Sequence, residues 1–162
     1  MAQAAQVIAM LACALGQFVQ SERLAAAGSA IIPGMLLEEV LGKVQEHSTA
    51  GGNAQTLFAL SDLTVGGSID TAYAVGTTVR YGAAHSGQEV FALVAASATA
   101  IADGAPLQSA GNGTLAVWVG QAVNEGGAAT LAIETNNIVA YAMEAIDNSG
   151  GATSVRIKAR AA

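Results

Sequence analysis

The stretch Val155-Arg156-Ile157-Lys158-Ala159-Arg160, near the end of a chain of 162 residues, shows the clearest pattern in the sequence. Apolar side chains alternate with cationic ones throughout it. Because successive side chains of a strand point to opposite faces, this period of two predicts a half-buried strand with one apolar and one cationic face. The preceding residues 138–146 and the turn sequence Asn148-Ser149-Gly150-Gly151 complete a predicted C-terminal β-hairpin.

Toward the N-terminus, short apolar and β-branched runs are separated by turn signals such as Asp103-Gly104 and Gly111-Asn112-Gly113. Such runs favour strands, and turn signals at intervals of about 8–12 residues are typical of an all-β barrel or sandwich. The chain length fits one domain. We therefore expect a mainly β domain whose further strands cover residues 56–60, 73–81, 89–94, 106–107 and 114–119.

The first 30 residues differ from the rest of the chain. The first basic residue is Arg23, so the start lacks the basic region of a secretion signal, and its apolar run is too short to span a bilayer. We expect an N-terminal arm or short helix over residues 1–30, a β domain over 31–162, and no membrane partner. Large apolar side chains recur at helical spacing in the arm, at Val7, Met10, Leu11, Leu15 and Phe18.

Charged residues make up only 11% of the chain, against about 25% in ordinary soluble domains, so small and uncharged side chains must form much of the surface. Such a surface is easily buried against another chain. The formal net charge is −6, and basic residues do not cluster outside the C-terminus. Because nucleic-acid binding places Lys or Arg against the phosphates, we expect no direct nucleic-acid partner.

Residues that could carry chemistry are few and scattered. Cys13 is the only cysteine, which excludes an intrachain disulfide or a Cys-based zinc site and suits a reducing cytoplasm. His47 and His85 lie next to turn signals, as ordinary loop histidines do. A Cys13–His85 nucleophile pair is conceivable, but a cysteine in an apolar run is more often buried and inert. We expect no enzyme activity and no catalytic, cofactor-binding or metal-binding residue.

Two features of the β domain are candidates for contact with a partner. Arg156, Lys158 and Arg160 form either a solvated strand face or a docking surface for an acidic partner, since the rest of the chain carries three basic and twelve acidic residues, a sum of −9. Trp118 suits either a core position or an interface anchor. Together with the apolar residues of the arm, these four form the candidate interface with a partner or between copies of the chain.

The order of several short segments resembles that of the tailed-bacteriophage capsid decoration, or cement, proteins, a family related to the lambda-type head decoration proteins. Each segment is only a strand edge with a turn, so their order from about residue 30 to the C-terminus carries the resemblance. The segments are Ile31-Ile32-Pro33-Gly34-Met35-Leu36, His47-Ser48-Thr49-Ala50-Gly51-Gly52, Tyr73-Ala74-Val75-Gly76-Thr77-Thr78-Val79, Gly87-Gln88-Glu89-Val90-Phe91-Ala92, the stretch 104–113 (GAPLQSAGNG) and the stretch 140–149 (AYAMEAIDNS).

The resemblance implies a small β-barrel or β-tulip domain, an arm that reaches onto the capsid, and commonly a homotrimer at local three-fold positions of the shell. It implies the major capsid protein as partner, the outer surface of the virion as location after assembly in the host cytoplasm, and stabilisation of the expanded head as function. The alternative is a receptor- or glycan-binding β module of a tail fibre or head-exposed protein. That role would need an aromatic shelf, whereas the seven aromatic residues are dispersed along the chain.

Residues 35–47, MLLEEVLGKVQEH, allow two interpretations. Their composition favours a helix, but Gly42 interrupts the pattern, and Pro33-Gly34 suits the central positions of a type II turn that leads into a strand. Because the resemblance implies a β domain here, we predict strands.

Overall fold

The computed structural model of the chain describes residues 19–26, 28, 30–62, 67–120 and 137–162. These residues form β-strands and no helix, which confirms the predicted mainly β fold. The strands are β1 (Val19–Leu24), β2 (Leu36–Val40), β3 (Lys43–Glu46), β4 (Leu57–Ala59), β5 (Thr78–Ala83), β6 (Glu89–Val94), β7 (Pro106–Ser109), β8 (Leu115–Val117), β9 (Ala140–Ala142) and β10 (Val155–Ala161).

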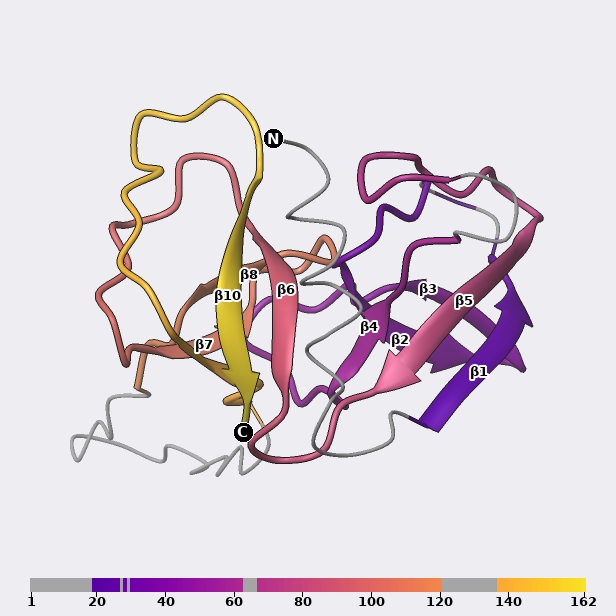
Figure 1. Cartoon of the computed structure of the whole chain (residues 1–162), viewed down its shortest axis with the longest axis horizontal. Coiled ribbons are helices and arrows are strands. Elements are labelled where there is room, and N and C mark those ends of the chain that lie inside the picture. The colour runs from indigo at the N-terminus through magenta and orange to yellow at the C-terminus, as the bar shows by residue number, and fades with distance from the viewer. Residues whose placement is uncertain (1–18, 27, 29, 63–66, 121–136) are drawn as a thin grey trace, which may run out of the picture.

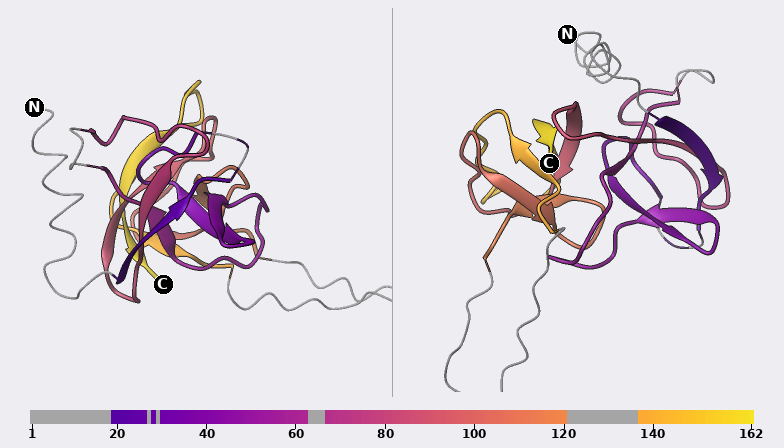
Figure 2. Two further views of the ribbon diagram at one scale, coloured as in Figure 1. Left: turned by 90° about the vertical axis from the view of Figure 1, so that its right-hand side faces the viewer. Right: turned by 90° about the horizontal axis from the view of Figure 1, so that it is seen from below.

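The strands form two sheets that lie side by side (Figures 1 and 2). The first sheet has five strands in the order β1-β5-β4-β2-β3. The second is a closed barrel, in the order β10-β6-β8-β7-β9, with β9 returning to β10. Neighbouring strands pair antiparallel except β6 and β8, which pair in parallel through Val94 and Leu115. The predicted barrel is therefore present, and the first sheet packs beside it.

The first sheet begins within the segment that the sequence predicts as an arm. β1 pairs along its full length with β5, from Val19 opposite Ala83 to Leu24 opposite Thr78. Ala25 then forms a parallel bridge with Val44 of β3, and the Ala26 amide donates to the Val44 carbonyl at 2.7 Å. The two edge strands of the first sheet thus approach each other. Residues 1–18 of the predicted arm or helix lie outside the described residues.

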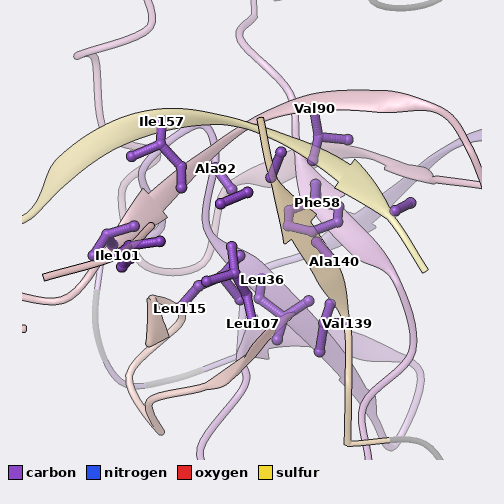
Figure 3. Packing of buried hydrophobic residues seen from close by; sticks show 14 of the residues in the cluster. Leu36, Phe58, Val90, Ala92, Ile101, Leu107, Leu115, Val139, Ala140 and Ile157 are labelled. Atoms are coloured by element: carbon purple, nitrogen blue, oxygen red, sulfur yellow. The ribbon is translucent and has the colours of Figure 1, made fainter. Parts of the chain in front are cut away.

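Each sheet has its own hydrophobic core, and the strands between them contribute to both. Leu36 and Phe58, on β2 and β4, point into the barrel core (Figure 3). Their chain neighbours Leu37 and Leu57 belong to the first-sheet core. In the opposite direction, Leu93 of the barrel strand β6 packs into the first-sheet core. The period of two along each strand therefore joins the two sheets into one packed unit.

Gly34 holds the two sheets together through its backbone. Its amide donates to the Ala59 carbonyl of β4 at 2.8 Å, and its carbonyl accepts from the Leu93 amide of β6 at 3.1 Å. Its φ is +91°, and a Cβ atom at this position would lie 2.6 Å from the Phe91 carbonyl oxygen. The predicted Pro33-Gly34 turn is confirmed, and only glycine fits both the backbone conformation and the close approach.

Several predicted strands are confirmed. Residues 35–47 form β2 and β3, joined by a turn at Leu41-Gly42, so the strand interpretation is correct. Residues 89–94 form β6 with the predicted bounds. The alternation in the last strand is also confirmed, because Ile157 and Ala159 are buried in the barrel core.

Two predicted strands are wrong in extent. The strand predicted over residues 73–81 starts only at Thr78, because a turn in which the Thr77 amide donates to the Ala74 carbonyl at 3.1 Å precedes it. The first strand of the C-terminal hairpin, predicted over 138–146, is reduced to β9. It ends there because the Glu144 carboxylate accepts from the Lys158 amide at 2.7 Å, while Ile146 pairs with Ile101.

Candidate binding surfaces

The outer face of the barrel carries a row of arginine, aromatic and proline side chains. Arg160 on β10 lies opposite Tyr141 on β9, and Tyr141 lies opposite Pro106 on β7. The Trp118 amide, directly after β8, donates to the Pro106 carbonyl at 2.8 Å. We call these four residues the barrel row. The barrel core buries the residues that alternate with them along the strands, namely Ala159, Ala140 and Leu107. The barrel row therefore points outward.

A hollow of about 490 Å³ opens beside one end of the barrel row. The chain turn at Asp103-Gly104 forms one wall, because the Gly104 amide donates to the Ala142 carbonyl at 2.9 Å. The hollow thus combines an acidic, a cationic and a phenolic side chain with apolar ones. Its lining residues are Asp103, Gly104, Tyr141, Ala142, Met143 and Arg160.

The three predicted cationic residues of β10 have different surroundings. The Arg156 guanidinium lies 2.6 Å from the Asp70 carboxylate, donates to the Pro33 carbonyl at 3.2 Å and also donates to the Ile69 carbonyl. It therefore links the barrel to loops of the first sheet. Lys158 is half-buried, and Arg160 is exposed and only loosely paired with Glu89, at 3.9 Å. The structure brings Arg160 and Trp118 into one row, whereas Arg156, farther from it along β10, is bound to Asp70, Pro33 and Ile69.

The sequence allows Trp118 either a core position or an interface position. In the structure Trp118 is half-buried, so its burial is intermediate between the two. Its indole Nε1 is buried and has no hydrogen-bond partner within the described part of the chain. Tyr141 completes the row and is the exposed tyrosine, since Tyr73 and Tyr81 are buried. Sequence inspection missed Tyr141 because its outward orientation follows from the register of β9 with β7 and β10.

The first sheet exposes a second, apolar surface. Arg23 Nε and Glu39 Oε1 lie 3.4 Å apart, and the residues that follow them, Leu24 at the end of β1 and Val40 at the end of β2, are both exposed. Leu41 comes next, at the tip of the β2–β3 hairpin, with 98% of its surface exposed and a φ of +51°. Val40 and Leu41, which are adjacent at the β2–β3 turn, are here called the apolar tip.

Other exposed apolar side chains add to the first sheet. Among the described residues, five of the seven exposed large hydrophobic side chains belong to it: Val19, Leu24, Val40, Leu41 and Val75. The remaining two, Val119 and Tyr141, lie on the barrel. The sequence offered only a weak signal for the apolar tip, namely a leucine before Gly42 where the hairpin turns.

A polar network includes Glu39, the residue directly before the apolar tip in β2. The Tyr81 hydroxyl donates to Glu39 Oε1 at 2.5 Å and accepts from Arg23 Nε at 3.1 Å. The bond from Tyr81 is the main cause that lowers the pKa of Glu39, and Arg23 contributes to the same effect. Burial, together with the bond to Glu39, raises the pKa of Tyr81. The network ties β1 to β2 and β5, next to the open end of the first sheet.

A serine–histidine pair, which the sequence did not suggest, lies between the two sheets. His47 Nδ1 is 2.8 Å from the Ser109 hydroxyl, and His47 Nε2 is 3.1 Å from the Asn53 carbonyl. If Nε2 carries the proton and donates to Asn53, the Ser109 hydroxyl donates to Nδ1. Ser109 is fully buried and His47 is 3% exposed, so the pair links the end of β7 to the segment after β3 and is closed to a substrate. Residues 62 positions apart in the chain give no local signal of such a pair.

The remaining candidate residues of the arm lie outside the described residues: Val7, Met10, Leu11, Leu15, Phe18 and Cys13. The arm interface and the Cys13–His85 pair therefore stay predictions. His85 itself is an exposed loop residue whose amide donates to the Gln88 side chain at 2.8 Å. Within the described ranges, no group of three or more His, Cys, Asp or Glu side chains could hold a metal ion. The same residues contain no helix that is long and apolar enough to cross a membrane.

Comparison with known proteins identifies no family for this chain. The chain matches neither a protein-family model nor a curated protein. The surfaces described above are therefore the basis on which a function can be argued.

Proposed function

We propose that this protein is a non-enzymatic capsid decoration protein of a tailed bacteriophage, which binds the major capsid protein on the outside of the expanded head. The observation that carries the proposal is the apolar tip, where Leu41 presents 98% of its surface to solvent. The segment order that resembles the decoration family supplies the identity of the partner. The sealed His47–Ser109 pair supports a role without chemistry, because no substrate reaches a fully buried hydroxyl.

Leu41 is costly for the isolated protein in two ways. A leucine in the left-handed conformation is disfavoured by about 1–2 kcal/mol relative to the usual conformations, and Asn or Gly is preferred in a tight hairpin turn. Its side chain also leaves apolar surface in water. Contact with a partner compensates the second cost, whereas the backbone cost remains, and Val40 enlarges the apolar area available for that contact.

Stabilisation of a shell then follows from geometry and copy number. A standard interface buries about 800 Å² on each partner, and linking three such footprints in a homotrimer can raise avidity about 10²–10⁴-fold. A trimer that contacts neighbouring capsid subunits adds contacts across the boundaries that internal DNA pressure strains. The low charge of the chain reduces the cost of desolvating such a surface.

The test uses purified protein and expanded, undecorated heads of the cognate phage. We expect saturable binding at three-fold or quasi-three-fold positions, seen by sedimentation and imaging, with a raised temperature of head disruption. Leu41→Asn should weaken binding at least about tenfold while stabilising the free protein, because asparagine tolerates the left-handed turn. Val119→Asn, which removes an exposed apolar side chain from the barrel, is the matched control and should bind normally.

Absence of binding by the wild-type protein would overturn the decoration role. Unchanged binding by Leu41→Asn would instead show that the apolar tip is not the contact. A deletion of residues 1–18 tests the predicted arm separately, since it leaves β1 intact, and loss of capsid occupancy or of the trimer is the expected result.

A further inference from the structure

The barrel offers no strand edge to a partner. Its five strands close into a ring, from β10 through β6, β8 and β7 to β9 and back to β10 (Figure 1). An extended peptide usually gains affinity by adding a strand to an open edge. Recognition on this part of the molecule must therefore use outward side chains, and the barrel row is the set that the strand register aligns.

The side chains of the barrel row could form a flat binding surface for a ligand ring. Tyr141 is exposed, Pro106 and Trp118 are half-buried beside it, and three strand spacings of about 4.8 Å give the row a length of about 14 Å. The apolar face of a sugar ring packs well against such surfaces, and the row is long enough for more than one ring. The aromatic residues at positions 118 and 141, which are dispersed in the sequence, thus lie on either side of Pro106, because β7 separates β8 from β9.

The hollow beside Tyr141 adds converging polar groups to this surface. Arg160 contributes a guanidinium whose side chain is 54% exposed and which lies 3.9 Å from the Glu89 carboxylate, so donors remain available for a carboxylate. Asp103 faces the same hollow and can accept hydrogen bonds only from donors, such as hydroxyl groups. The hollow is open to solvent, and Ala142 and Met143 add apolar surface between these polar groups.

The pairing of Arg160 with Asp103 discriminates between classes of ligand. A ligand with a carboxylate and adjacent hydroxyl groups satisfies both side chains at once. An acidic peptide such as polyglutamate offers carboxylates to Arg160 but has no hydroxyl groups beside them for Asp103. We propose that the hollow and the barrel row bind an acidic carbohydrate, with the sugar carboxylate on Arg160, sugar hydroxyls on Asp103 and the ring against Tyr141. The site is separate from the apolar tip and does not depend on the capsid role.

The experiment measures binding by calorimetry and by chemical-shift changes, with two matched pairs of probes. Trigalacturonate is compared with its trimethyl ester, and sialyllactose is compared with lactose. We expect saturable binding of at least one acidic sugar, with its neutral counterpart at least about tenfold weaker because the charge-assisted bond to Arg160 is lost.

Variants locate the site on the full chain. Arg160→Gln and Tyr141→Ala should each weaken binding of the acidic sugar at least about tenfold. Lys43→Gln, which removes an exposed cation from the first sheet, is the charge-matched control and should bind normally. The proposal is overturned if no acidic sugar binds, if Tyr141→Ala binds normally, or if a short glutamate peptide binds as tightly as the sugar; the last result would identify an acidic-peptide site.

Discussion

Leu36 and Leu37 are neighbours in the chain, yet both are fully buried in two different hydrophobic cores. Leu36 packs in the barrel and Leu37 in the first sheet, because successive side chains of β2 point to opposite faces. One short strand thus couples the two halves of the molecule, and Phe58 and Leu57 repeat the arrangement on β4.

This coupling predicts that the protein unfolds as one unit. Leu36→Ala and Leu37→Ala should each lower the free energy of unfolding by about 2–5 kcal/mol in a single transition, since each leaves a cavity in a core that shares strands with the other. Leu41→Ala, at the exposed hairpin tip, should change it by less than about 0.5 kcal/mol. Chemical denaturation followed by fluorescence and circular dichroism provides the measurement, and two separate transitions would contradict the prediction.

Gly34 and Gly87 allow a matched comparison of backbone conformation and steric fit. Their φ angles are nearly the same, +91° and +88°, but a Cβ atom would meet the Phe91 carbonyl oxygen at position 34 and open space at position 87. Gly87→Ala should therefore cost about 1–2 kcal/mol of stability. Gly34→Ala should cost at least about 3 kcal/mol, because it also separates β6 from the first sheet. Equal losses of stability in the two variants, measured by thermal unfolding, would show that the close approach of Gly34 to Phe91 does not add to the cost of the substitution.

Arg156 links the barrel to the first sheet, and we expect its removal to weaken that link. Arg156→Gln should lower the free energy of unfolding by about 1.5–3 kcal/mol, mainly through the lost bonds to the Pro33 and Ile69 carbonyls. The bond to Asp70 adds little, because the Asp70 side chain is 76% exposed. Arg160→Gln is the control, with an expected change below about 0.5 kcal/mol. A similar loss in both variants would argue against a specific role for Arg156.

The Glu39–Tyr81 bond predicts an acid-dependent contribution to stability. Tyr81 lowers the pKa of Glu39 below its ordinary value of 4.5, so the folded state binds this proton less readily than the unfolded chain. The stabilisation is then complete above pH 4.5 and is lost as the pH falls through the lowered pKa. Tyr81 has a raised pKa, so its own contribution is complete below pH 10 and is lost as the pH rises above that value.

Carboxyl carbon shifts measured by NMR in wild type and Tyr81→Phe test this assignment. The pKa of Glu39 should rise toward 4.5 in the variant. Glu38 is the internal control: burial opposes its ionisation, but bonds from Gln45 and Ser48 lower its pKa, and none of these groups is changed. An unchanged pKa of Glu39 would show that the bond from Tyr81 does not control it.

The sequence by itself determined those features that depend on local pattern. The alternation of Ile157 and Ala159 with cationic residues gave a correct strand, and Pro33-Gly34 gave a correct turn, because strand period and turn conformation are properties of a few consecutive residues. Composition and turn spacing similarly predicted a mainly β chain. For residues 35–47 the local pattern left helix and strand open and the resemblance favoured strands, which is correct; Gly42 supports the hairpin turn with a φ of +76°.

Only the tertiary structure decided which faces meet. The sequence predicts that Leu36 and Leu37 lie on opposite faces, but not that each face meets a separate core. Arg156 was a candidate for partner contact, and it contacts Asp70, 86 residues away. Tyr141 and Trp118 join one row through the register of β9, β7 and β8. Contacts between distant segments depend on the packing of the whole chain, so no short stretch of sequence contains the information that specifies them.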